Sequence, residues 1–189
     1  MTIDSAAVNS IPPVADSHQT LQKLARNTLT AFLLTFVLGR TLVLLIMTRH
    51  MPDLFLNIGQ THVHHLNYGI FMLVAVAGWG VFAGPRQPEW RKRMALLYGV
   101  GLALTFDEFG MWLHLGGSYW QRASYDAVVW VAAALGLLSV LPGIRQWDRS
   151  NWVVAVAIGI VTIFALKLMS EQLNLWQPFL LEIEKLAPQ

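Results

Sequence analysis

Residues 94–114 read MALLYGVGLALTFDEFGMWLH, an apolar stretch that contains two adjacent acidic residues, Asp107 and Glu108. The stretch is long enough for one membrane crossing, because a helix needs roughly 20 residues to span a hydrocarbon core about 30 Å thick. A carboxylate inside such a span is costly unless it is paired or faces a cavity. The stretch therefore predicts a membrane helix that carries part of a polar site.

The composition of the whole chain agrees with a membrane protein. Of the 189 residues, 55% are hydrophobic and only 13% are charged, which is more apolar than an average soluble domain. We expect an all-α, polytopic membrane protein with about five transmembrane helices. The expected spans are about 28–48, 66–84, 94–114, 126–142 and 151–170.

The two ends of the chain differ from its apolar middle. Residues 1–20 predict a disordered polar tail rather than a secretory signal, because no basic cluster precedes the first apolar run. Residues 21–170 make up the expected five-helix transmembrane domain. Residues 171–189 predict an amphipathic helix at the membrane surface, since apolar residues recur at three- and four-residue spacing from Leu173 to Leu186.

The placement of basic residues predicts the orientation. Arg40 and Lys167 lie within spans, and the other Lys and Arg residues are unevenly divided between the two sides. By the positive-inside rule, the N-terminus is cytoplasmic and the C-terminus lies outside, in a multi-pass protein of the inner (plasma) membrane. The inner set is Lys23, Arg26, Arg86, Arg91, Lys92, Arg93, Arg145 and Arg149, and the outer set is Arg49, Arg122 and Lys185.

This orientation brings the unusual polar residues toward the outer surface. The run His62-Val63-His64-His65 comes just before the second span, and His114 ends the third. At about 1.5 Å per helical residue, Arg40 and Asp107 lie at similar depths below the outer ends of their helices. We therefore expect these residues to form one site.

The simplest interpretation of Arg40 is a structural ion pair with Asp107 or Glu108 that joins the first and third spans. A buried ion pair is weak evidence for stability, because desolvation opposes the Coulombic attraction. One arginine also leaves the second of two adjacent carboxylates without a counter-charge, so that it is protonated unless a cation is present. This leaves room for a metal ion or a proton-transfer role. We expect Asp107 to pair with Arg40 and Glu108 to be the chemical residue.

Three histidines in four residues suit a zinc or iron ion, for which imidazole is a common ligand. In an extended segment His62 and His64 point the same way, and in a helix His62 and His65 share a face. We expect all three to be metal ligands, with a carboxylate beside them. His114 either completes this set or serves as an acid or base. The alternative is a polar outer loop whose imidazoles lie in water.

The loop before the fourth span predicts a place for a substrate headgroup. Arg122 beside Tyr119 and Tyr125 suits a phosphate or carboxylate group, so these three are the candidate substrate-binding residues. The alternative is local, with Ser124 capping the fourth span and Asp126 interacting with its helix dipole.

Two segments, HVHHLNYGI at residues 62–70 and LTFDEFGMWLHL at 104–115, resemble a group of small bacterial integral membrane proteins that are usually labelled uncharacterised. The similarity covers roughly residues 60–130. It implies a bacterial inner-membrane protein and supplies no activity. Membrane fatty-acid desaturases place more histidines in several boxes, and this chain with six histidines departs from that pattern.

The leading hypothesis is a metal-dependent hydrolase that acts on a lipid or another amphiphilic substrate. A metal ion held by imidazoles lowers the pKa of bound water to near 7, so it supplies a nucleophile without the cysteine that this chain lacks. Glu108, Asp107 and His114 are the candidate catalytic residues. The alternatives are a proton or metal transporter, and a non-catalytic structural or partner-binding protein. We expect membrane lipids and no nucleic acid as partners, and the oligomeric state stays open.

Overall fold

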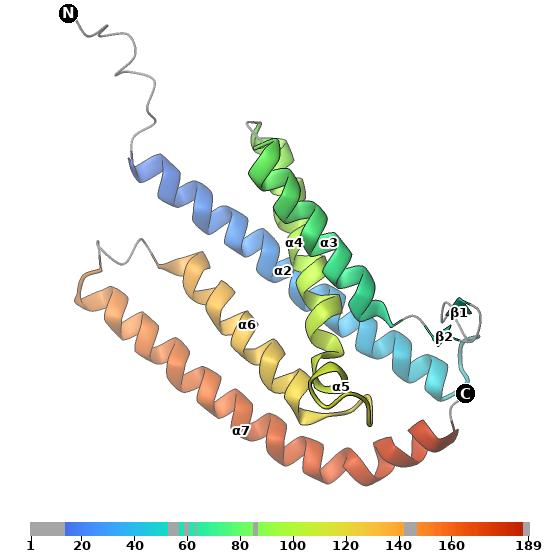
Figure 1. The fold of residues 1–189 in the computed structure, drawn as a ribbon. Coiled ribbons are helices and arrows are strands. Elements are labelled where there is room, and N and C mark those ends of the chain that lie inside the picture. The colour runs from blue at the N-terminus through green and yellow to red at the C-terminus, as the bar shows by residue number, and fades with distance from the viewer. Residues whose placement is uncertain are drawn as a thin grey trace, which may run out of the picture.

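The structure, a computed structural model, describes residues 14–52, 57–58, 61–62, 64–84, 87–141 and 147–186 (Figure 1). These residues are almost all helical, apart from a two-residue antiparallel ladder that pairs Asn57 with His62. The elements are α2 (Val14–Met47), β1 (Asn57–Ile58), β2 (Thr61–His62), α3 (His65–Phe82), α4 (Pro88–Asp107), α5 (Phe109–Leu113), α6 (Arg122–Val140) and α7 (Arg149–Leu186).

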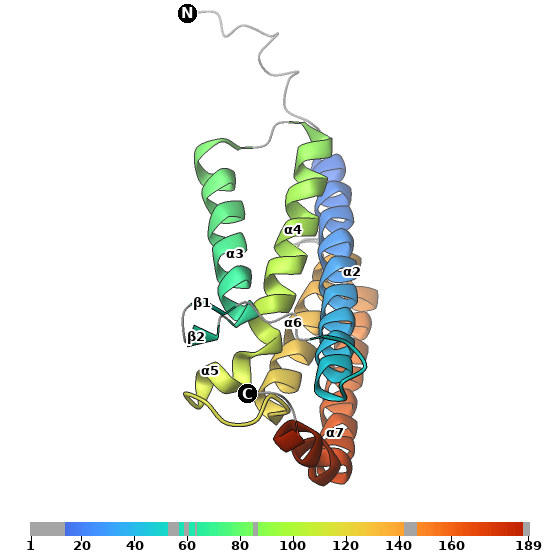
Figure 2. The same cartoon turned by 90° about the vertical axis from the view of Figure 1, so that its right-hand side faces the viewer.

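The long helices pack as a bundle with α4 near its middle. On one side α4 contacts α3, on the other it contacts α2, and α7 lies outermost against α6 (Figures 1 and 2). Helices α2, α4 and α6 meet in an apolar core around Phe32, whose side chain is fully buried. The remaining core residues are Leu102, Ala103, Val128 and Leu135.

Glycines allow α4 to approach both of its neighbours closely. A Cβ atom at Gly99 would clash with the carbonyl oxygen of Thr28 on α2. A Cβ atom at Gly69 of α3 would lie 2.7 Å from the backbone nitrogen of Thr105 and 2.8 Å from the carbonyl oxygen of Gly101. Because these neighbours are backbone atoms, neither contact can be relieved by a side-chain rotation.

The surface of the bundle is that of a multi-pass membrane protein. Four helices are long and apolar enough to cross a membrane, namely α2, α3, α6 and α7. Their outward faces expose large apolar side chains, such as Phe71 on α3 and Ile163 on α7. The fifth long helix, α4, has charged residues near its start and Asp107 at its end. The expectation of an all-α, membrane-spanning protein is confirmed at this level.

The helix bounds correct one of the expected spans. The third span does not continue as one helix to residue 114, because α4 ends at Asp107 and Glu108 has φ −101° and ψ 11° before α5 begins. Just after this break, the Gly110 N–H donates a 2.8 Å hydrogen bond to Ser124 Oγ on α6. Packing against α6 therefore accompanies the change in helix direction.

The ends of the chain also differ from expectation. Residues 14–20 belong to α2 rather than to a tail, and residues 1–13 lie outside the described residues. The expected surface helix at 171–189 is the continuation of α7, which runs to Leu186 and contains Pro178. Figure 1 shows α7 bending toward the bundle near its C-terminal end, as expected where a proline cannot donate its backbone hydrogen bond.

The glycine contacts generate the first prediction. Gly69→Ala should lower the free energy of unfolding by about 1–3 kcal/mol, because α3 and α4 must move apart to accept the methyl group. Gly78→Ala on the same helix has no atom within 4 Å of the new Cβ and should be neutral or slightly stabilising. Denaturant unfolding of both variants in detergent micelles measures the difference. Equal losses would contradict the close crossing.

Candidate functional site

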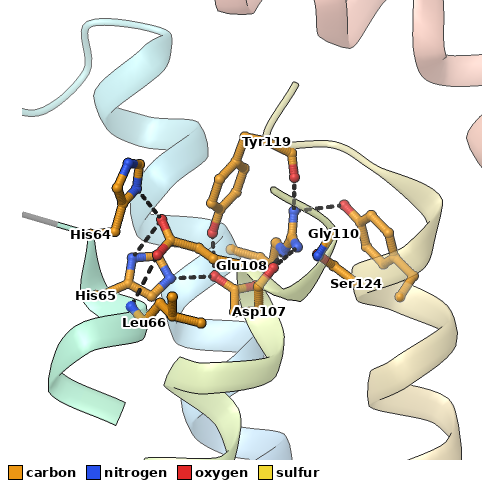
Figure 3. A network of polar contacts seen from close by, with 10 residues as sticks. His64, His65, Leu66, Asp107, Glu108, Gly110, Tyr119 and Ser124 are labelled. Carbon is orange, nitrogen blue, oxygen red and sulfur yellow. Dashed lines mark hydrogen bonds and ion pairs between the residues drawn. The ribbon is translucent and has the colours of Figure 1, made fainter. Parts of the chain in front are cut away.

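Charged side chains from separate segments of the chain meet in one network of polar contacts (Figure 3). Arg40 comes from α2, Asp107 from the last residue of α4, and Glu108 from the break after it. His64 and His65 come from the start of α3. Thus the ends of two helices and the beginning of a third form the site.

Arg40 binds the C-terminal end of α4. Its Nε lies 2.5 Å from Asp107 Oδ1, and its Nη2 donates a 2.6 Å hydrogen bond to the Asp107 carbonyl oxygen. That carbonyl is at the negative end of the helix dipole, where a cation is favourable. Both residues are buried, and Asp107 is only 2% exposed. The pair therefore fixes α2 against α4.

An aromatic cage surrounds the Arg40 guanidinium. Its Cζ lies 4.3 Å from the ring centroid of Tyr119 and 4.4 Å from that of Tyr125, and Phe36 and Trp120 follow at 5.5 Å. Its Nη1 also donates to the Tyr119 carbonyl oxygen at 3.1 Å and to the Tyr125 hydroxyl at 3.2 Å. Cation–π contacts and hydrogen bonds thus hold this arginine within the protein.

Asp107 has two further partners on its second oxygen. His65 Nε2 lies 2.7 Å from Asp107 Oδ2, and the Tyr119 hydroxyl donates to the same atom. Burial raises the pKa of Tyr119 well above its usual range, so the phenol keeps its proton and acts as a donor. Arginine, histidine and tyrosine together surround the Asp107 carboxylate.

Glu108 is held by the start of α3. Its Oε2 accepts a 3.0 Å hydrogen bond from the Leu66 backbone N–H, which is in the first turn of that helix. Its Oε1 lies 3.1 Å from His64 Nδ1 and 3.4 Å from His65 Nδ1. The helix N-terminus has a positive partial charge, so it is a favourable place for a carboxylate. Glu108 therefore caps α3 from another segment of the chain.

His65 bridges the two carboxylates. Its Nε2 faces Asp107 and its Nδ1 faces Glu108. Carboxylate oxygens only accept hydrogen bonds, so Nε2 is the donor in the 2.7 Å hydrogen bond to Asp107, whereas Nδ1 lies 3.4 Å from Glu108. His65 is therefore a polar neighbour of both carboxylates, beside the ion pair of Arg40 with Asp107.

A cavity of about 450 Å³ opens next to Glu108 and His64. Its volume is in the range of small-molecule sites. Glu108 is part of the cavity wall although it is only 4% exposed, whereas Asp107 is not among the lining residues. The remaining wall is largely apolar and consists of Leu66, Asn67, Met111, Trp112, Leu115, Gly116 and Gly117.

The predicted headgroup clamp does not form as one group. Tyr119 and Tyr125 lie against Arg40, while the Arg122 side chain is 59% exposed and pairs with Asp126 one turn away at 3.1 Å. This i,i+4 contact is local to the start of α6, whereas the alternative drawn from the sequence was an interaction of Asp126 with the helix dipole.

One predicted histidine lies apart from the carboxylates, and the side chain of another is outside the described residues. His114 is exposed, and its Nδ1 is 2.6 Å from Gln121 Oε1 and 3.0 Å from the Gly110 carbonyl oxygen. It shares no helical face with Asp107, because α4 ends before it. The backbone of His62 lies in β2, and its side chain is outside the described residues.

Glu184 also contacts the residues of this site, although the sequence did not predict it. Its carboxylate accepts hydrogen bonds from the Tyr119 N–H at 2.8 Å and the Ser118 hydroxyl at 2.6 Å. The end of α7 thereby holds the loop from which Tyr119 reaches Asp107. The sequence suggested only a polar face of an amphipathic helix, and no local pattern indicated a partner 65 residues away.

Metal ligation is not apparent among the described residues. No three His, Asp or Glu side chains within them are grouped so as to hold a metal ion. Comparison of the chain with protein-family models, with curated proteins and with solved structures gives no match. The geometry of the site is therefore the basis for a functional proposal.

The Arg40 contacts generate the second prediction. Arg40→Ala leaves the buried Asp107 without its nearest counter-charge, so it should cost about 3–5 kcal/mol of unfolding free energy. Combining Arg40→Met with Asp107→Asn should restore part of this loss. Arg122→Ala, which removes an exposed pair, should cost about 1 kcal/mol or less. Unfolding in detergent measures all three, and equal effects at positions 40 and 122 would exclude a buried ion pair.

Proposed function

We propose that this chain is an inner-membrane enzyme that hydrolyses a lipid or another amphiphile, with Glu108 as general base. The observation that carries the proposal is the position of Glu108, which belongs both to the buried charge network and to the cavity wall. A general base must reach the proton that it abstracts, and a buried carboxylate beside a cavity meets that requirement.

The different surroundings of the two carboxylates support this assignment. Asp107 contacts Arg40, His65 and Tyr119 and is not part of the cavity wall. Glu108 has histidine and amide partners and lines the cavity. We infer that Asp107 maintains the structure and that Glu108 performs the chemistry. Paired carboxylates in unlike environments commonly divide their roles in this way.

The proposed reaction is ester or phosphoester hydrolysis. The oxygen of a water molecule bonds to the electrophilic carbon or phosphorus, and Glu108 accepts a proton from that water. The bond to the leaving oxygen then breaks, and Glu108 returns the proton to this oxygen. The cavity suits an amphiphilic substrate, because polar atoms of His64, Asn67 and Glu108 share its wall with Leu66, Met111, Trp112 and Leu115.

Zinc or iron remains part of the proposal, with His62 and His64 as ligands. The pairing of His64 Nδ1 with Glu108 at 3.1 Å supports it, since metal-bound imidazoles commonly bind a carboxylate through their second nitrogen. His65 is the weaker candidate, because each of its ring nitrogens already faces a carboxylate. A bound metal ion would activate the attacking water.

We also propose five spans, a cytoplasmic N-terminus and a site on the outer side. The start of α2, the start of α4 and the start of α7 lie at one end of the bundle, opposite the site (Figure 1). Basic residues gather at these starts, namely Lys23 and Arg26, then Arg91, Lys92 and Arg93, then Arg149. The positive-inside rule favours the cytoplasm for that end.

A structural role for the polar site is the second candidate. The bond from the Leu66 amide to Glu108 favours it, because this contact alone would stabilise the start of α3. The charged network around Asp107 and Glu108 lies at one end of the bundle, so the transporter hypothesis has less support. A substitution that retains the cap but removes the base separates the two candidates.

Glu108→Gln is that substitution, and it generates the third prediction. The amide oxygen can still accept from Leu66, so folding should be nearly unchanged. Hydrolysis should fall by about 10²–10⁴-fold, the usual contribution of a general base. Purified protein in vesicles of bacterial lipids, with products followed by mass spectrometry, provides the measurement. Asp126→Asn is the matched control and should retain activity. Full activity in Glu108→Gln would remove the assignment.

The fourth prediction concerns the metal ion. Elemental analysis of purified protein should find zinc or iron in near-stoichiometric amount. The variant with both His62→Ala and His64→Ala should lose it. His114→Ala should retain it, because His114 is bound to Gln121 rather than to the carboxylates. If metal-free protein is fully active, the metal ion is not part of the reaction and the proposal is reduced to a hydrolase that needs no metal.

A further inference from the structure

The segment after the helix break exposes apolar side chains at the polar end of the bundle. Helix α5 presents Trp112 and Leu113 outward, and Leu115 in the following turn is 94% exposed. Exposed leucine and tryptophan side chains at this end would be unfavourable in water. We call Trp112, Leu113 and Leu115 the apolar tip, and the exposed His114 between them contacts Gln121.

The backbone fixes this tip in place. Leu115, Gly116 and Gly117 have φ values of 52°, 129° and 91°, in a region that a leucine rarely adopts. Hydrogen bonds hold the turn, from the Gly116 N–H to the Met111 carbonyl at 2.8 Å and from Gln121 Nε2 to the Gly116 carbonyl at 2.7 Å. The outward Leu115 is thus part of a turn that is held by its own hydrogen bonds.

The apolar tip also borders the cavity. Trp112 and Leu115 line it on one side, and Leu66 lines it from the first turn of α3. One turn further along α3, Ile70 and Phe71 are exposed, and Phe71 is 73% exposed. Figure 2 shows α5 next to the start of α3. Apolar side chains therefore lie on both sides of the cavity, at the tip and on a helix face that suits the bilayer, while His64 and Asn67 are polar parts of the cavity wall.

We propose that the apolar tip inserts into the membrane leaflet and that the cavity opens sideways to it. The ligand is then a bilayer lipid, whose polar head reaches His64 and Glu108 while its chains stay between the tip and α3. The apolar side chains on both sides of the cavity favour a lipid leaflet as the occupant, because the same surface would be unfavourable in water. The chemistry at the head rests on the proposed function, whereas insertion of the tip does not.

Spin labels test the insertion directly, since the chain has no cysteine of its own. Leu115→Cys would carry a nitroxide in vesicles of phosphatidylethanolamine and phosphatidylglycerol. Phe71→Cys is the bilayer control, and Glu89→Cys at the opposite end is the water control. The label at position 115 should be relaxed by oxygen more than by a water-soluble nickel chelate, as at position 71. A response like that at position 89 would overturn the proposal.

Photo-crosslinking tests the source of the ligand. A two-chain phospholipid with a diazirine in one acyl chain, placed in the same vesicles, should label peptides that contain residues 64–71 and 109–117. A single-chain diazirine analogue supplied from water is the comparison. Labelling of these peptides by the water-supplied analogue alone would overturn access from the leaflet. Neither experiment measures hydrolysis, so the proposed function can fail while lipid access holds.

Discussion

Two neighbouring carboxylates buried at the end of α4 need polar partners, and this requirement organises the structure. Arg40 pairs with Asp107, and the His65 ring lies between Asp107 and Glu108. The helix ends add to both contacts, because Arg40 binds the carbonyl end of α4 and Glu108 binds the amide end of α3. A charge network that spans three helices thus forms from side chains and backbone groups together.

The remainder of the fold positions these groups. Close crossings at Gly69 and Gly99 bring α3 and α2 against α4, so that their side chains can reach its C-terminal end. The loop before α6 contributes Tyr119, and Glu184 at the end of α7 holds that loop. Asp107 is enclosed on several sides as a result, whereas Glu108 faces the cavity. The proposal that Asp107 is structural and Glu108 is reactive rests on this asymmetry.

The apolar runs predicted the helices well, because a membrane span is defined by length and composition. The sequence predicted Arg40, Asp107 and the histidines at one end of the bundle, because successive spans of similar length run in opposite directions. The break at Glu108 was missed, since it depends on Gly110 packing against Ser124 on another helix. The contacts of Glu184 were also not predictable, because they depend on tertiary packing, whereas the pair of Arg122 with Asp126 is a local i,i+4 contact that the sequence analysis did not consider. The spacing of residues along the sequence indicates which face of a helix a side chain is on and how deep it lies. Its contacts with other side chains depend on how the helices pack.

The central claim is that Asp107, rather than Glu108, is the ion-pair partner of Arg40. Magic-angle-spinning NMR on protein in lipid bilayers can compare the distances from the Arg40 guanidinium carbon to the two carboxyl carbons, with assignments confirmed by Asp107→Asn and Glu108→Gln. The structure predicts strong dipolar coupling to the Asp107 carboxyl and weaker coupling to that of Glu108. A stronger coupling to Glu108, or none to either residue, would contradict the division of roles between them.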